Sequence, residues 1–122
     1  GSEIFGVDVQ IDEELYLVGS LHTGKGADIP SANDLTLGMD GNYFDITGTT
    51  TINRIATAGW NAGDEFKLQF DGVVQVTDAV AAGGGFGTIL MTSSENYTSA
   101  AGGILSVLYD GTSFKAWPVF ME

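Results

Sequence analysis

The amino-acid sequence predicts an all-β protein: an antiparallel β-sandwich or barrel with an extended N-terminal arm. Three observations support this fold class. The chain of 122 residues has 18 glycines but only two prolines, and Thr, Val, Ile, Phe and Tyr are abundant. Such a composition suits short strands joined by tight turns. No window shows the periodicity of an amphipathic helix, and three Asp-Gly pairs stand between apolar segments.

The three Asp-Gly pairs predict β-hairpins, because both residues of a two-residue turn tolerate positive φ angles. The pairs are Asp40-Gly41, Asp71-Gly72 and Asp110-Gly111. We expect each pair to join the segments on either side of it: 35–38 with 42–46, 65–70 with 73–77, and 104–109 with 112–120. Three hairpins in succession would make the sheet antiparallel.

Further strands are expected at 49–55, which is β-branched almost throughout, at 86–91 and at 16–18. Before residue 35 the pattern changes, because loop-forming residues are frequent there and apolar residues are sparse after Leu21. We therefore divide the chain into an arm or connector, residues 1–34, and an antiparallel β domain, residues 35–122. Gly1-Ser2 is interpreted as the remnant of a cleaved tag.

Composition excludes several classes of protein. Hydrophobic residues make up 43% of the chain and charged residues 16%, which is unlike a disordered segment. Sixteen acidic against four basic residues give a net charge of −12. Nucleic acid is not an expected partner, because its binding depends on Lys and Arg. Membrane insertion is not expected either, since no apolar run approaches the ~20 residues of a spanning helix.

Candidate catalytic residues are few. His22 is the only histidine and cysteine is absent, so a catalytic triad would depend on a residue of the arm. Asp40, Asp71 and Asp110 are better explained as turn residues than as acid–base pairs. The segment Asp40 to Asp45 resembles part of a calcium loop but lacks the bidentate Glu. We expect a protein that is not an enzyme, with no catalytic residue, cofactor or dedicated metal site.

Two aromatic residues in predicted loops, Trp60 and Tyr97, are candidates for ligand binding. An exposed aromatic ring can pack against the apolar face of a sugar, which would make the chain a carbohydrate-binding module. The alternative is packing in the core or at a subunit interface, which the usual burial of large aromatic residues favours.

Three stretches of the sequence carry a resemblance to a known family: LTLGMDGNYFDITGTTTINRI (35–55), GDEFKLQFDG (63–72) and SAAGGILSVLYDGTSFKAWPVF (99–120). Together they resemble the β module at the distal ends of bacteriophage tail fibres and tailspikes. The chain departs from the family pattern at Gly103, where Asp is usual, and at Phe114, where Trp is usual. These motifs specify turns and strands rather than chemistry.

The resemblance implies an all-β homotrimer on the surface of a tailed-phage virion, a fibre module for assembly and host adhesion. Its partners would be other virion proteins, a fibre stem or a capsid, and a host-surface glycan. Related small trimeric proteins decorate phage capsids, and capsid decoration is the alternative role. The family module contributes no catalytic residues.

Self-association is also expected from the residues themselves. The arm and the C-terminal run 117–121 carry more apolar surface than a small barrel needs for its core. Exposed apolar patches usually mark interfaces, and closed symmetry would bury this one. The residues we expect in the oligomer interface are Leu15, Leu17, Trp117, Val119 and Phe120.

Overall fold

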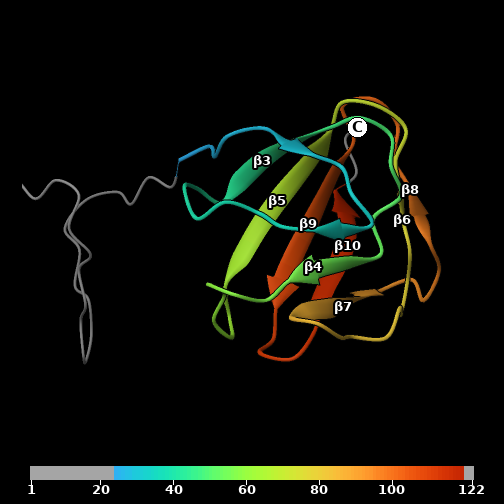
Figure 1. Ribbon diagram of the computed structural model, residues 1–122. Coiled ribbons are helices and arrows are strands. Elements are labelled where there is room, and N and C mark those ends of the chain that lie inside the picture. The colour runs from blue at the N-terminus through green and yellow to red at the C-terminus, as the bar shows by residue number, and fades with distance from the viewer. Residues whose placement is uncertain (1–23, 120–122) are drawn as a thin grey trace, which may run out of the picture.

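The computed structural model describes residues 24–119 and is built of β-strands (Figure 1). Ten strands occur in this part of the chain: β1 (Ile29–Pro30), β2 (Asp34–Leu35), β3 (Tyr43–Thr47), β4 (Arg54–Ala56), β5 (Glu65–Phe70), β6 (Gln75–Val76), β7 (Phe86–Met91), β8 (Tyr97–Thr98), β9 (Ile104–Tyr109) and β10 (Phe114–Val119). The described residues include no helix that could cross a membrane. The predicted all-β class is confirmed.

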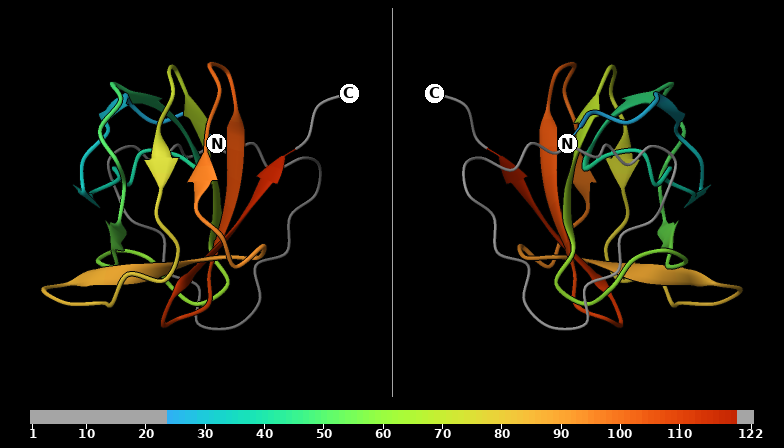
Figure 2. Two further views of the ribbon diagram at one scale, coloured as in Figure 1. Left: turned by 90° about the vertical axis from the view of Figure 1, so that its right-hand side faces the viewer. Right: turned by 90° about the vertical axis from the view of Figure 1, so that its left-hand side faces the viewer.

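Eight of the strands form one curled sheet, a half-barrel, in the order β1-β3-β5-β9-β10-β7-β4-β2. The other two, β6 and β8, form a small antiparallel sheet on one side of it (Figure 2). The prediction of an antiparallel sheet is wrong in one respect, because the large sheet is mixed. The pairs β1–β3, β3–β5, β7–β10 and β2–β4 are parallel. Parallel neighbours need crossover connections, and the chain between β3 and β5 passes through β4 near the opposite edge of the sheet.

This topology corrects two of the three predicted hairpins. Asp71-Gly72 follows β5, but β5 is already paired with β3 on one side and β9 on the other. The chain therefore continues to β6, which pairs with β8. Asp40-Gly41 also joins no hairpin, because β2 pairs with β4 while β3 lies between β1 and β5. Local turn residues do not decide which neighbour a strand acquires.

The connection from β9 to β10 does reverse the chain, and the two strands pair antiparallel along their whole length. Its turn differs from the expected one. The amide of Asp110 donates to the carbonyl of Ser113 (3.0 Å), so the two central residues are Gly111 and Thr112. Gly111 has a φ of 97°, whereas Asp110 precedes the turn. The Asp110 carboxylate accepts hydrogen bonds from the amides of Thr112 (2.8 Å) and Ser113 (2.7 Å).

The strands predicted at 65–70, 86–91 and 104–109 have the bounds of β5, β7 and β9. The segment expected as a strand at 49–55 forms one only at β4, although both of its isoleucines, Ile52 and Ile55, are buried. Residues 24–34, the described part of the predicted arm, contribute β1 and the first residue of β2 to the sheet. The strand expected at 16–18 lies outside the described residues.

The core lies on the inner, concave side of the curled sheet. Along β5, Phe66, Leu68 and Phe70 are buried while Glu65 and Lys67 are exposed, which is the alternation of a strand covered on one face. Aromatic rings make up much of the centre of the core. Phe66 packs edge-on against Phe44 and Phe114, with distances between ring centroids of 6.5 Å and 6.0 Å. The small sheet adds Val76, and the buried Ser99 accepts a hydrogen bond from the amide of Val74 (2.9 Å).

Candidate functional site

The outer, convex face of the sheet divides into two regions of different chemistry. The side chains that alternate with the core residues on β3 and β5 are polar, apart from one aromatic ring; we call this region the polar half: Tyr43, Asp45, Glu65, Lys67 and Gln69. The equivalent side chains on β7, β9 and β10 include a group of large apolar residues, which we call the apolar stripe: Leu90, Ile104, Leu108, Trp117 and Val119.

The strand register brings the apolar stripe together. Ile104 lies directly opposite Val119, and Ser106 lies directly opposite Trp117. Leu90 is opposite Lys115 and so diagonal to Trp117. Side chains in these relations are within reach of one another on one face of a sheet. The five stripe residues are half-buried, and Lys115 is the one charged residue that β9 and β10 place on this face.

Two of the five predicted interface residues, Trp117 and Val119, lie in the apolar stripe. Leu15, Leu17 and Phe120 lie outside the described residues. The sequence analysis did not identify Leu90, Ile104 and Leu108 as surface residues of the stripe. For Ile104 and Leu108 the sequence did contain an indication, because in the segment 104–109 apolar residues occur at positions that would face both sides of a strand. A strand of that kind needs cover on both faces.

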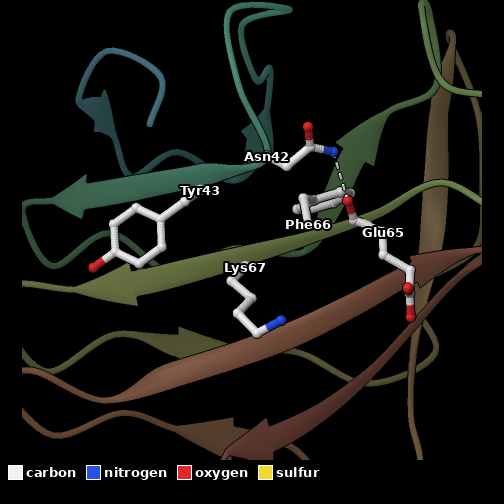
Figure 3. Close-up of a pocket in the computed structure, with 5 residues that line it drawn as sticks. All are labelled: Asn42, Tyr43, Glu65, Phe66 and Lys67. Atoms are coloured by element: carbon white, nitrogen blue, oxygen red, sulfur yellow. Dashed lines mark hydrogen bonds between the residues drawn. The ribbon is translucent and has the colours of Figure 1, made fainter. Parts of the chain in front are cut away.

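The polar half contains a pocket of about 420 Å³ at the start of β3 and β5 (Figure 3). It is lined by Asn42, Tyr43, Glu65, Phe66 and Lys67. The side-chain amide of Asn42 (Nδ2) donates to the carbonyl of Glu65 (2.7 Å), and the backbone amide of Lys67 donates to the carbonyl of Asn42 (2.9 Å). The backbone bond continues the parallel pairing of the two strands, and the side-chain bond adds a second link between them at the pocket wall.

Tyr43 and Lys67 face each other across β3 and β5 on the outer face. The Tyr43 hydroxyl donates to Oε1 of Gln69, which holds the ring along the sheet surface beside Lys67. Within residues 24–119, Lys67 forms no ion pair, whereas the other three basic residues do. Lys25 pairs with Asp28 and Asp45, Arg54 with Asp34, and Lys115 with Asp110.

The two aromatic residues expected to bind a ligand lie apart from each other. The Trp60 ring packs against the Phe66 ring, with 4.7 Å between the ring centroids, and the Tyr97 ring packs against the Phe70 ring, with 6.0 Å between the centroids. Phe66 and Phe70 are four residues apart on β5, or about 13 Å along the strand. Both rings are half-buried against the core, and burial raises the pKa of Tyr97. Their role in ligand binding stays a prediction.

Several of the acidic side chains have structural partners. Arg54 lowers the pKa of the Asp34 carboxyl, which it contacts through Nε (2.8 Å) and Nη2 (2.9 Å). The amides of Ser113 and Thr112 lower the pKa of Asp110. In the part of the chain that the structure describes, no group of three His, Cys, Asp or Glu side chains is arranged to hold a metal ion. His22 lies outside that part.

The comparisons with known proteins add no relative. No family model, no curated protein and no solved structure matches this chain. The resemblance to phage fibre modules therefore stays an interpretation of the sequence, and the site has to be interpreted from its own geometry.

Proposed function

We propose that this protein is a non-enzymatic structural module that assembles with copies of itself through the apolar stripe. Following the resemblance of its sequence, we assign it to the surface of a tailed-phage virion, as a homotrimeric fibre or tailspike module for assembly and host adhesion. The observation that carries the proposal is the stripe: five large apolar side chains gathered on the outer face of β7, β9 and β10.

Two physical arguments favour a second copy as the occupant of the stripe. Removing apolar surface from water stabilises association by about 25 cal/mol per Å². The charge of the chain then selects where copies can touch, because two molecules of charge −12 repel each other over most of their surfaces. The outer face of β9 and β10 carries only Lys115 as a charged residue, so contact there costs the least repulsion.

The stripe would be the centre of an interface rather than the whole of it. A specific interface uses roughly 20–30 residues from each partner. The stripe supplies five, so neighbouring residues have to complete it. Apolar residues of the arm such as Leu15 and Leu17, together with Phe120, are the candidates that the sequence offers. In a closed ring of three copies, every copy would bury this surface, and no unpaired surface would remain to which further copies could add.

Light scattering on the purified chain tests the proposal. We expect a particle of three times the chain mass of 12.8 kDa at micromolar concentration. Leu108→Glu, which places a charge inside the stripe, should give a folded monomer. Thr88→Glu is the matched control, because Thr88 is also on the outer face but opposite Arg54, and it should leave the assembly intact. A monomeric wild-type chain would overturn the proposal.

Capsid decoration is the alternative role for the same assembly, and it predicts affinity for capsid particles instead of a fibre stem. A pull-down with purified capsids and with fibre stems separates the two roles. A third possibility is a carbohydrate-binding module attached to another protein. It requires binding of a saccharide by the isolated chain without the assembly.

A further inference from the structure

We infer that the pocket between β3 and β5 binds a neutral pyranose unit of a glycan, with Tyr43 as the stacking ring and Lys67 and Glu65 as hydrogen-bonding partners of its hydroxyls. This inference rests on the adhesive part of the proposed function and assigns it to residues that differ from Trp60 and Tyr97. Figure 3 shows Tyr43, Glu65 and Lys67 around the pocket.

The stacking surface is the ring of Tyr43. Its hydroxyl bonds Gln69 on the neighbouring strand, so the ring is held in place before a ligand arrives. A fixed ring loses little conformational entropy on binding, which favours affinity. The ring is half-buried and lines the pocket, unlike Trp60 and Tyr97, which pack against core phenylalanines. A sugar with an apolar face of C–H groups can pack on such a ring.

The hydrogen-bonding groups are Glu65 and Lys67, two residues apart on the same face of β5 and both exposed. This separation is about 7 Å along the strand, so one sugar unit can contact both side chains. The carboxylate accepts from a hydroxyl and the ammonium group donates to one. Hydrogen bonds to ionised groups are about twice as strong as bonds between neutral groups.

The charge around the pocket selects a neutral sugar. Glu65 and Lys67 carry opposite charges, and nearby Asp45 is paired with Lys25 (3.1 Å), so no net positive charge is available to hold an anion. The chain as a whole carries −12, which repels sugars with carboxylate or phosphate groups. The volume of about 420 Å³ is within the usual range for a small-molecule site.

Amide NMR of the isotope-labelled full-length chain tests the inference. The probes are glucose, galactose and mannose as neutral sugars, and glucuronic acid and N-acetylneuraminic acid as acidic ones. We expect saturable shifts at the amides of Asn42, Tyr43 and Lys67 with at least one neutral sugar, and weaker or no shifts with both acids. No shift at these amides with any neutral sugar, or a preference for the acids, would overturn it.

Variants of Tyr43 and Lys67 locate the site. Tyr43→Thr keeps a strand-forming residue but removes the ring, and should abolish the shifts. Lys67→Gln should weaken binding about fivefold or more, because it removes a charged donor. Lys115→Gln makes the same change on the outer face of β10, outside the pocket, and should leave binding unchanged. If Tyr43→Thr does not fold, Tyr43→Phe serves instead, because it keeps the ring and frees it from Gln69. Tyr43→Phe should bind the sugar more weakly than the wild type but still give saturable shifts.

The assembly and the sugar site can fail separately. The titration is repeated on Leu108→Glu, which should be monomeric, and the pocket lies on other strands. Shifts in this variant support the sugar site independently of the assembly. An assembled wild-type chain without shifts contradicts the sugar site alone.

Discussion

Strands β5 (Glu65–Phe70) and β9 (Ile104–Tyr109) are neighbours of equal length that pair antiparallel, and an Asp-Gly pair follows each of them. Their inner faces are alike, because each contributes three buried apolar or aromatic residues to the core. Their outer faces differ. On β5 the outward side chains are Glu, Lys and Gln, whereas on β9 they are Ile, Ser and Leu.

The inner and outer faces of the same sheet therefore have different roles. The inner faces determine the fold, since they supply the apolar area whose burial drives folding. The outer faces determine what the folded sheet can contact. In our two proposals, the outer face of β5 contacts water and a small polar ligand, and the outer face of β9 contacts a second copy of the chain. Substitutions on the two faces should therefore affect different measurements.

The largest effect on stability is expected at the inner face of β5. Phe66→Ala removes a ring that packs against Phe44, Trp60 and Phe114, and should lower the free energy of unfolding by about 3–5 kcal/mol. Lys67→Ala, the next residue but on the outer face, should change it by less than about 0.5 kcal/mol. Urea unfolding monitored by circular dichroism measures both. Equal losses would show that the two faces of β5 are not distinct.

Two buried serines allow a finer comparison. Ser99 accepts from the amide of Val74 and donates to the carbonyl of Gly72 (2.7 Å). Ser99→Ala leaves a buried amide without its partner, so we expect a loss of about 1–3 kcal/mol in the free energy of unfolding. Ser106 is also buried but lies on the outer face of β9, and its side chain bonds no other described residue. Ser106→Ala should cost less than half as much in the same urea titration.

The difference between the outer faces can be tested by exchange, because Gln69 and Ile104 are directly opposite each other. Ile104→Gln makes β9 resemble β5, and should weaken assembly about tenfold, as expected for loss of a central interface contact. Gln69→Ile extends the stripe onto β5 and should not weaken assembly. Sedimentation equilibrium gives both dissociation constants. An unchanged constant for Ile104→Gln would place the interface elsewhere.

The strands themselves were predictable where the sequence alternates or is continuously apolar over six residues. The bounds of β5, β7 and β9 follow from such local patterns. The pairing of the short strands was not predictable. β6 lies within the strand expected at 73–77, but it pairs with β8 rather than with β5, and β2 pairs with β4, so both acquire neighbours distant in sequence. The parallel pairing of β3 with β5 is of the same kind, because a crossover through β4 leaves no local signal.

The same limit applies to the candidate site. Trp117 and Val119 could be selected as interface candidates from the sequence, because they belong to an apolar run near the C-terminus. The structure places them in the apolar stripe, and their role in an interface stays a prediction. The pocket was not predictable, because Asn42–Tyr43 and Glu65–Lys67 meet only through the parallel pairing of their strands. Tyr43 is one of four tyrosines, and its hydrogen bond to Gln69 exists only in the folded sheet.

The two Asp-Gly pairs at the ends of β5 and β9 give the smallest expected effect. Asp110 accepts two backbone hydrogen bonds that lower its pKa below the ordinary value of 3.8, whereas the Asp71 side chain bonds no other described residue. A carboxyl group whose pKa is lower in the folded state stabilises the fold above its unfolded pKa, and this contribution is lost as the pH falls through the folded value.

Asp110→Asn should therefore lower the melting temperature at pH 7, and the difference from the wild type should shrink as the pH falls below 3.8. Asp71→Asn is the matched control, and should shift the melting temperature less at pH 7. Thermal unfolding at pH 7, 4 and 3 measures both differences. A difference for Asp110→Asn that stays constant down to pH 3 would mean that the charge of Asp110 does not stabilise the turn.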